Sequence, residues 1–552
     1  MLRTGHLDLF ARDHLPRKEL QPDLIFTRPE VRYPERLNAA VELLDRNVKR
    51  GHGDRIALRT DDAVCTYRQL QAQVNRIAHV LRNDMSLVPG NRVLLRGANN
   101  PMMAACLLAV IKAGLIAVPT MPLLRARELH PILEKAQVTA ALCDIRLRDG
   151  LLQAQSHSPL QQVLYFNDGD GRTPAGGSLE AVCAKRPDEF PACDTAQDDI
   201  ALIAFTSGTT GQPKGTMHMH RDILAMCDLF PRSILKPSAD DIFCGTPPLA
   251  FTFGLGGLLC FPMRFAASVL LLEKATPDSL LAAIARHRAT ILFTAPTFYR
   301  QMAALARNHD IGSLKNCVSA GEALPDATRQ LWLGTTGIQM IDGIGATEMI
   351  HIFIAAADDD VRRGAIGKVV PGYEARIVDD DMGTVPAGTV GRLAVRGPTG
   401  CRYLADERQR QYVRDGWNLT GDTFRMDADG YLFYQARSDD MIISAGYNIA
   451  GPEVEDALLS HRAVAECAVI GAPDEARGQA VKAFVVLRPG FSAGTGMSRE
   501  LQDHVKQAIA PYKYPRMIEF VESLPRTETG KLQRFRLREA AAGASGAASG
   551  KA

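Results

Sequence analysis

The clearest chemical pattern in the chain lies between residues 203 and 215, which read IAFTSGTTGQPKG. An apolar run over residues 200–205 has the length and the bounding residues of a buried strand. The turn that follows is rich in glycine, which lets a backbone approach an anion, and in amides and hydroxyls that donate to one. This composition predicts a phosphate-binding loop, formed by Thr206, Ser207, Gly208, Thr209, Thr210, Gly211 and Lys214.

The spacing of this loop is G-x-x-G-x-x-K, which differs from the G-x-x-x-x-G-K-[ST] spacing of a Walker A loop. Lys214 would place a mobile positive charge at the far end of the turn. Taken alone, the same stretch is also compatible with a flexible Ser/Thr/Gly linker.

Composition narrows the class of protein that carries this loop. With 552 residues the chain is long enough for two or more domains, and its formal net charge of +2 favours neither nucleic acid nor an anionic membrane as a partner. No secretory signal and no apolar stretch of spanning length is visible. The eleven cysteines never form C-x-x-C, so we expect a cytoplasmic protein with reduced, buried cysteines.

The elements around the loop alternate between strands and helices. After Pro89-Gly90, residues 92–95 predict a strand, 101–113 a helix and 115–118 the next strand, and similar alternation continues to about residue 341. A helix is also expected from about His220 to Phe230. Such alternation predicts an α/β fold of doubly wound parallel sheets, with ligands bound beyond the carboxyl ends of the strands.

The pattern changes after Gly364, where short strands and turns predict an antiparallel, barrel-like β subdomain. Beyond a boundary at residues 437–440 the pattern is that of a compact α+β unit. We therefore expect a large N-terminal domain over residues 1–438, a small C-terminal domain over 439–540, and a disordered, small-residue tail over 541–552.

Five further stretches share a mixture of acidic, basic, hydroxyl and glycine residues. They are SAGE at 319–322, DGIGATE at 342–348, LTGD at 419–422, RSDD with SAGY at 437–447, and PRTETGK at 525–531. In this order and spacing, together with the loop, they resemble the adenylate-forming enzymes, which include acyl-CoA synthetases, peptide-synthetase adenylation domains and luciferases. The resemblance covers roughly residues 40 to 540.

The resemblance implies a reaction in two steps and assigns roles to residues. In the first step a carboxylate attacks the α-phosphate of ATP and displaces pyrophosphate, a step that positioning and electrostatic stabilisation catalyse. The implied catalytic residues are Lys531, Thr347 and Glu348, with Glu348 also holding Mg²⁺. The implied nucleotide and CoA contacts are the loop together with Gly321, Glu322, Asp342, Gly343, Asp422, Arg437 and Gly446.

In the second step the resemblance implies that the small mobile domain rotates about a hinge at Asp439. The rotation withdraws Lys531 and brings Gly446 to the tunnel through which the coenzyme A thiol enters. Each of these residues has a simpler interpretation by itself: Lys531 as a solvated surface lysine, Asp422 as a turn residue, and Glu348 as a surface cap or ion-pair partner.

Within this family the chain looks most like the benzoate-CoA ligase branch, and in particular like 2-aminobenzoate-CoA ligases. That likeness implies an aryl-acid site lined by Phe251, Thr252, Phe253, Ala320, Gly345, His351 and Ile352. Hydroxycinnamate-type relatives carry His where Phe251 stands, and benzoate ligases usually carry Ala and Tyr where Thr252 and Phe253 stand. A substituted benzoate is therefore expected over benzoate itself. Core packing is the alternative for the two phenylalanines, and a hydrogen-bonded core position for His351.

The predicted function is that of an ATP-dependent aryl-CoA ligase acting on 2-aminobenzoate or a related benzoate, with ATP, Mg²⁺ and coenzyme A. The alternatives are an aryl-acid adenylation enzyme that loads a carrier protein in trans, a medium-chain acyl-CoA synthetase, and a sensor without catalytic activity. No nucleic acid or membrane partner is expected. The sequence leaves open the preferred acid, the pathway served and the oligomeric state, for which a homodimer is one option.

Overall fold

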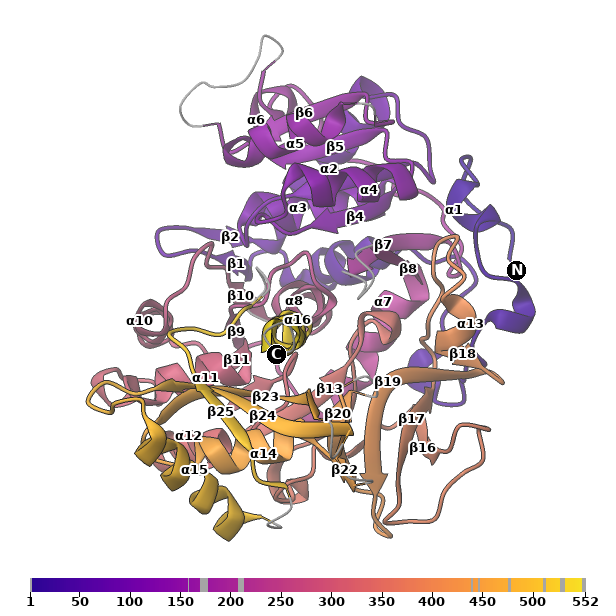
Figure 1. Ribbon diagram of the computed structural model, residues 1–552. Coiled ribbons are helices and arrows are strands. Elements are labelled where there is room, and N and C mark those ends of the chain that lie inside the picture. Colours follow the sequence, from indigo (N-terminus) through magenta and orange to yellow (C-terminus); the bar gives the residue numbers. More distant parts are fainter. Residues whose placement is uncertain are drawn as a thin grey trace.

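The strands of the chain form four sheets, which Figure 1 shows from the violet sheet at the top to the yellow-orange elements below. The structure, a computed structural model, describes residues 2–156, 158–168, 177–206, 213–437, 440–444, 447–474, 478–509, 513–526 and 532–548.

The first sheet has six strands in the order β6-β5-β3-β4-β7-β8. All its pairings are parallel except that of β7 with β8. Its strands are β3 (Arg92–Arg96), β4 (Ile116–Thr120), β5 (Ala140–Asp144), β6 (Gln162–Phe166), β7 (Ile200–Thr206) and β8 (Lys214–Met219). The accompanying helices are α2 (Tyr67–His79), α3 (Pro101–Lys112), α4 (Ala126–Lys135), α5 (Arg148–Gln155) and α6 (Leu179–Cys183). Helix α3 begins where the Asn100 side chain accepts a hydrogen bond from the Met103 amide.

The second sheet has nine strands in the order β15-β14-β13-β12-β11-β9-β10-β1-β2. Its centre is parallel and both edges are antiparallel. The strands are β1 (Ile56–Arg59), β2 (Val64–Thr66), β9 (Ile242–Gly245), β10 (Ser268–Leu270), β11 (Ile291–Thr294), β12 (Asn316–Ser319), β13 (Met340–Gly345), β14 (Ile352–Ala356) and β15 (Lys368–Val369). The helices that follow its strands are α8 (Thr252–Leu255), α9 (Phe261–Arg264), α10 (Pro277–His287), α11 (Pro296–Ala303) and α12 (Asp326–Thr336), whereas α7 (His220–Asp228) follows β8 of the first sheet. The segment before β1 contains the π-helical turns η3 (Val41–Asp45) and η4 (Val48–His52).

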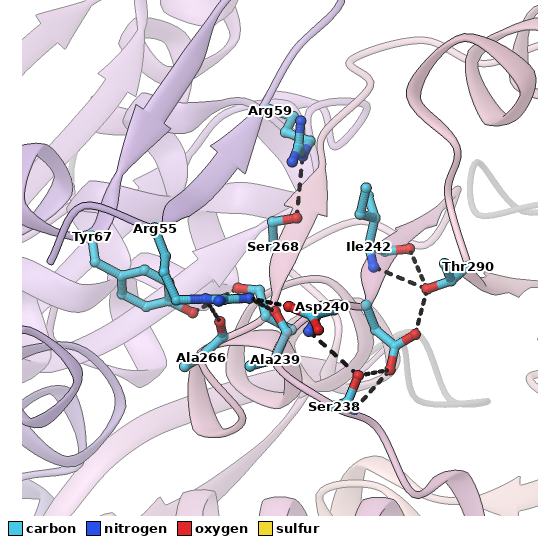
Figure 2. Close-up of polar contacts among 12 residues, drawn as sticks. Arg55, Arg59, Tyr67, Ser238, Ala239, Asp240, Ile242, Ala266, Ser268 and Thr290 are labelled. Atoms are coloured by element: carbon cyan, nitrogen blue, oxygen red, sulfur yellow. Dashed lines mark hydrogen bonds and ion pairs between the residues drawn. The ribbon is translucent and has the colours of Figure 1, made fainter. Parts of the chain in front are cut away.

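A group of polar contacts connects residues at the starts of β1, β9, β10 and β11 in this sheet, and Figure 2 shows it. The Arg55 guanidinium pairs with the Asp240 carboxylate at 2.8 Å, and the Tyr67 hydroxyl donates to the Ala267 carbonyl at 2.7 Å. The Thr290 hydroxyl donates to Asp241 and accepts from the Ile242 amide. These bonds satisfy polar groups at the strand starts, far from the carboxyl ends where a ligand is expected.

The third sheet is antiparallel and corresponds to the predicted β subdomain. It contains β16 (Glu374–Val378), β17 (Val390–Arg396), β18 (Val413–Arg414), β19 (Trp417–Met426) and β20 (Leu432–Arg437), with α13 (Gln409–Tyr412) beside it. Figure 1 places these orange strands at the right of the molecule.

The fourth sheet belongs to the C-terminal part and has its own buried apolar cluster, which includes Val454, Leu458, Val481 and Leu501. Its strands are β21 (Ile442–Ser444), β22 (Tyr447–Ile449), β23 (Val464–Asp474), β24 (Gly478–Leu487) and β25 (Met517–Phe520). Its helices are α14 (Gly451–Leu459), α15 (Thr495–Ala508) and α16 (Arg534–Ala548).

The structure confirms the α/β class and differs from the sequence expectations in three places. Residues 214–219 form strand β8, where we expected the loop to lead directly into a helix. Strand β13 continues through Gly345, where we expected a loop from Asp342 onward. Helix α16 reaches Ala548, where we expected a disordered tail from residue 541. Alanine has the highest helix propensity, and an anchored helix extends readily through such residues.

All eleven cysteines are free thiols, and most are buried, as predicted. In the described part of the chain, no helix combines the length and the apolar character needed to cross a bilayer.

Helix α16 generates a prediction about stability. Leu537 is 6% exposed and packs in a cluster with Ala468 and Phe484, whereas Phe535 on the same helix is 47% exposed. We expect Leu537→Ala to lower the free energy of unfolding of the C-terminal part by about 2–3 kcal/mol, because it leaves a cavity. Phe535→Ala is the matched control and should change it by less than about 0.5 kcal/mol. Urea unfolding followed by circular dichroism measures both, and equal effects of the two substitutions would contradict the packing of α16.

Candidate functional site

Strands β7 and β8 hold the two ends of the predicted phosphate loop. They pair antiparallel, with Thr206 opposite Lys214 at the loop end of the hairpin. The strand residues on either side of the predicted loop are therefore fixed on the sheet. The predicted loop residues Ser207, Gly208, Thr209, Thr210 and Gly211 lie outside the described residues.

The outer edge of β8 pairs with the chain segment over residues 402–404. The Met217 amide donates to the Arg402 carbonyl, and the Leu404 amide donates to the Gly215 carbonyl, each at 2.8 Å. This pairing places the Tyr403 ring beside Lys214, whose ammonium lies 5.4 Å from the ring centroid. The lysine of the predicted loop thus rests against an aromatic face, a favourable arrangement for a cation.

The predicted catalytic pair Thr347 and Glu348 lies in a 3-10 turn, η10 (Thr347–Met349), directly after β13. The His218 Nε2 lies 2.8 Å from the Thr347 carbonyl oxygen, so this nitrogen carries the proton and donates it. Burial lowers the pKa of His218 to about 4, and the imidazole is therefore neutral at physiological pH. The Tyr403 hydroxyl donates to Glu348 Oε1 at 2.5 Å. The structure brings Lys214, Thr347 and Glu348 to the same region.

Close packing explains the glycines that precede this turn. A Cβ on Gly345 would lie 2.7 Å from the His351 carbonyl oxygen, and one on Gly343 would lie 2.7 Å from the Ile352 side chain. Ile350, which follows the turn, has φ of +67°, a strained conformation for a β-branched residue. The chain reverses tightly here, and β14 returns against β13 with His351 and Ile352 at its start.

Asp342 lies in β13 opposite Ser319 of β12 and is 5% exposed. Burial raises its pKa to about 7, and the Arg329 guanidinium, 3.4 Å away, opposes that shift. A buried carboxyl that titrates near neutrality at the carboxyl end of the sheet suits a ligand-binding position, as the sequence predicts.

Asp422 and Arg437 face each other across strands β19 and β20, with an Oδ1–Nη1 distance of 3.3 Å. Asp422 is 8% exposed, and burial raises its pKa while Arg437 opposes the shift. Gly421 has φ of +77°, and a Cβ there would lie 2.9 Å from the Arg437 guanidinium. The pair fits the predicted role of binding ribose hydroxyls, because a carboxylate accepts two hydrogen bonds from a diol.

Glu322 connects the large domain to the C-terminal part. Its Oε2 accepts a hydrogen bond from the Thr297 hydroxyl at 2.7 Å, and its Oε1 lies 3.3 Å from the Arg526 guanidinium. Arg526 also pairs with Glu466 at 2.7 Å. Gly321, with φ of +90°, precedes Glu322 in the turn after β12. The ion pair holds the beginning of the PRTETGK stretch against the end of β12.

The predicted aryl-site residues of the 251–253 stretch lie at the start of α8. Phe251 precedes the helix, and Thr252 is 8% exposed. A Cβ on Gly254 would lie 2.1 Å from the Pro248 carbonyl oxygen, so glycine is required for this helix to fold back on the preceding turn. The turn η8 (Gly256–Cys260) continues α8.

His351 is surrounded by rings. Its centroid lies 4.5 Å from that of Phe261 and 5.8 Å from those of Phe253 and Phe230. Burial lowers its pKa to about 3, and a main-chain interaction with Phe253 opposes that shift. A neutral imidazole among aromatic rings is chemically compatible with the predicted aryl-acid site. Ala320 and Ile352, 4% and 2% exposed, are also buried.

The oxygen atoms of Glu348 are suitable ligands for the Mg²⁺ that the sequence resemblance implies. Tyr403 occupies one oxygen, and the other receives no hydrogen bond from the described residues. In the same part of the chain, no three His, Cys, Asp or Glu side chains gather into a metal site. A magnesium ion here would therefore complete its coordination with water and phosphate oxygens, as Mg²⁺ commonly does.

Three other predicted residues, Asp439, Gly446 and Lys531, lie outside the described residues. Two cavities of about 350 and 400 Å³ occur elsewhere. The first, lined by residues that include His309 and Thr336, lies at the starts of β12 and β13, the opposite end from the predicted site.

Sequence analysis missed His218 and Tyr403, which contact η10. His218 is one of two histidines in the alternating stretch MHMH, and this alternation was a usable sign of a strand with one buried polar face. Tyr403 lies 55 residues from Glu348 in the chain, and no local pattern relates the two.

Comparison with known proteins places the chain among nucleotide-using ligases. Residues 44–403 match the model of the AMP-binding enzyme family, and residues 453–531 match that of the AMP-binding enzyme C-terminal domain. Benzoate–CoA ligase of Thauera aromatica is 36% identical over 520 residues, which cover 93% of this chain and 98% of the relative.

Two solved structures are similar over nearly the same length. The crystal structure of the anthranilate CoA ligase AuaEII in complex with anthranoyl-AMP has a TM-score of 0.88 and 36% identity, covering 93% of this chain and 99% of that one. A benzoate CoA ligase from Burkholderia xenovorans LB400 has a TM-score of 0.83 and 31% identity, covering 91% of this chain and 100% of that one.

Asp342 generates a prediction about pH. Since its pKa is raised in the folded protein from 3.8 to about 7, folding takes up a proton between these values, and stability falls as pH rises toward 7. Asp342→Asn should remove this pH-dependent part of the free energy of unfolding, which changes by up to about 1.4 kcal/mol per pH unit. The free energy of unfolding of the variant minus that of the wild type should therefore increase from pH 5 to 7 and then level off. Urea unfolding at pH 5 to 8 measures the difference. The exposed Asp359→Asn is the control, and parallel pH profiles for Asp342→Asn and wild type would contradict the assignment.

Proposed function

We propose that this chain, which belongs to the AMP-binding enzyme family, is an ATP-dependent aryl-CoA ligase that activates a small benzoate-type acid and transfers it to coenzyme A. The observation that carries the proposal is the convergence of Lys214, Thr347 and Glu348 beside a wall of aromatic rings around His351. The similarity to benzoate and anthranilate CoA ligases over more than nine-tenths of the chain supports it.

In the first half-reaction, one carboxylate oxygen of the acid forms a bond to the α-phosphorus of ATP. The bond between that phosphorus and the β-bridging oxygen breaks, so pyrophosphate leaves and an aryl-adenylate remains. The loop and Lys214 bind the leaving phosphates, Thr347 contacts the α-phosphate, and Asp422 holds the ribose. Mg²⁺ bound through Glu348 would offset the negative charge of the ATP phosphates.

In the second half-reaction, the thiol sulfur of coenzyme A forms a bond to the acyl carbon. The bond from that carbon to the phosphate oxygen of AMP breaks, and the thiol proton passes to solvent. Rotation of the C-terminal domain about Asp439, with Gly446 at the thiol tunnel, would separate the two steps. Glu322 and Arg526 would then have to part, because their ion pair joins the two domains.

We propose 2-aminobenzoate or a related substituted benzoate as the acid. Thr252 brings a hydroxyl where benzoate ligases usually carry alanine, and Phe253 lacks the hydroxyl of their tyrosine. The neutral imidazole of His351, buried among aromatic rings, offers a polar group that a hydrogen-bonding ring substituent would use and that benzoate would not. The anthranilate CoA ligase with a TM-score of 0.88 supports this choice.

Three alternatives keep the same fold. An adenylation enzyme that loads a carrier protein in trans would transfer the acyl group to a carrier faster than to coenzyme A. A medium-chain acyl-CoA synthetase would prefer aliphatic acids, which the aromatic surroundings of His351 disfavour. A sensor would bind ATP or an aryl acid without acid-dependent pyrophosphate exchange.

The proposal predicts the outcome of a substrate panel. With ATP, Mg²⁺ and coenzyme A, 2-aminobenzoate should give equimolar AMP and thioester, with kcat/KM a few-fold to about tenfold above that of benzoate and further above those of cinnamates and medium-chain acids. ATP–pyrophosphate exchange and thioester formation measure this. No turnover with any aryl acid would refute the aryl assignment, and exchange without thioester would favour the carrier-protein alternative.

Lys531 provides a second prediction for the same enzyme. Because its ammonium would offset charge where the new acyl–phosphate bond forms, Lys531→Ala should slow aryl-dependent pyrophosphate exchange at least about 100-fold. Thioester formation from a chemically prepared aryl-adenylate should remain within a few-fold of wild type. Unchanged exchange would remove Lys531 from the catalytic residues.

A further inference from the structure

The turn η10 is held by three hydrogen bonds, one to each of its residues. His218 donates to the Thr347 carbonyl, the Thr399 hydroxyl donates to the Met349 carbonyl at 2.9 Å, and Tyr403 donates to the Glu348 carboxylate. The first two bonds fix the main chain. The bond from Tyr403 is the one that acts on the side chain expected to perform the chemistry.

The position of Tyr403 is itself strongly determined. Its amide donates to Gln409 Oε1 at 2.8 Å, and the residues on either side of it pair with β8. The side chain is 1% exposed, and its ring meets the Tyr412 ring edge-on with a centroid distance of 5.8 Å. A ring fixed in this way gives its hydroxyl one available direction, which is toward Glu348.

The neighbouring buried ion pair anchors the same segment. Arg402 Nη1 lies 2.9 Å from Asp222 Oδ2, and both side chains are almost completely buried. Asp222 also accepts a hydrogen bond from the Met219 amide at the start of α7. Residues 399–404 are thus connected to β8, to α7 and to η10, and a shift of Tyr403 would have to disturb all three.

We propose that Tyr403 is a positioning residue for the adenylation half-reaction, whose hydroxyl holds the Glu348 carboxylate in the orientation that ATP and its Mg²⁺ require. The inference rests on the proposed function and extends it to a residue that does not contact substrate. A glutamate side chain has several rotamers, and a hydrogen bond from a fixed donor to one oxygen leaves the other directed to the nucleotide.

The test compares Tyr403→Phe with Tyr412→Phe. The ring of Tyr412 adjoins that of Tyr403, and its buried hydroxyl has no hydrogen-bond partner in the described part of the chain. Tyr412→Phe therefore also removes a buried tyrosine hydroxyl, but it breaks no hydrogen bond among the described residues. For Tyr403→Phe we expect acid-dependent pyrophosphate exchange to fall about tenfold at saturating ATP, with a higher Mg²⁺ concentration at half-maximal rate. Thioester formation from prepared aryl-adenylate should stay within about twofold. Tyr412→Phe should match the wild type in both assays.

A double-mutant cycle tests whether Tyr403 acts through Glu348. In a Glu348→Gln background the additional loss from Tyr403→Phe should shrink to less than about twofold, because no carboxylate remains to orient. Calorimetric titration with ATP, with and without Mg²⁺, gives a readout that needs no turnover. The increase in ATP affinity caused by Mg²⁺ should be smaller in Tyr403→Phe than in the wild type.

Several results would overturn the proposal. Equal losses in both half-reactions would indicate a general structural role, and additive effects in the cycle would show that Tyr403 acts independently of Glu348. If Mg²⁺ raises the ATP affinity of Tyr403→Phe as much as that of the wild type, Tyr403 does not position Glu348. If the wild type activates none of the acids tested, the proposed function fails. The calorimetry still tests the role of Tyr403 in that case, because it needs no turnover.

Discussion

Strand β8 is the element on which the arrangement of the site depends, because it is bonded on both edges. One edge pairs with β7, and the other pairs with residues 402–404, which lead into the third sheet. From its buried face His218 reaches the turn after β13 of the second sheet. A strand bonded on two edges has a fixed register, and a slip of one residue would turn His218 to the opposite face. The three sheets of the large domain are thereby fixed relative to one another at the point where Lys214 begins β8.

The electrostatics of the site follow from this convergence. Asp342 and Asp422 are both buried, and in each case burial raises the pKa more than the neighbouring arginine lowers it. Burying acids in this way costs stability, and proteins retain such groups mainly where a ligand uses them. In the proposed function, ribose hydroxyls would donate further hydrogen bonds to the Asp422 carboxylate. The strained Ile350 beside the catalytic turn is a further cost located at the same place.

Much of the fold was predictable because its signals are local. The alternation of apolar strands and helices indicated the parallel sheets, and Pro101 marked the start of α3. Strand β8 was missed because Lys214 and Gly215 were assigned to the end of the loop and the short alternation after them was not used. Its strand conformation comes from pairing with β7 and with residues far along the chain. Helix α16 was missed for a related reason, since its small residues are ordered by the burial of Leu537 and Ala541 against β23.

The candidate site shows the same division between local and distant information. The motif residues could be named from the sequence, because each motif is short and its residue types indicate which groups it can bind. Their orientation could not, because it depends on contacts such as Tyr403 with Glu348 and Arg526 with Glu322, whose partners are 55 and 204 residues apart. The two contacts also differ in kind. The first lies within the large domain and is buried, so it can persist through both proposed half-reactions. The second is formed by partly exposed side chains and contributes little free energy, so it would not prevent the proposed domain rotation.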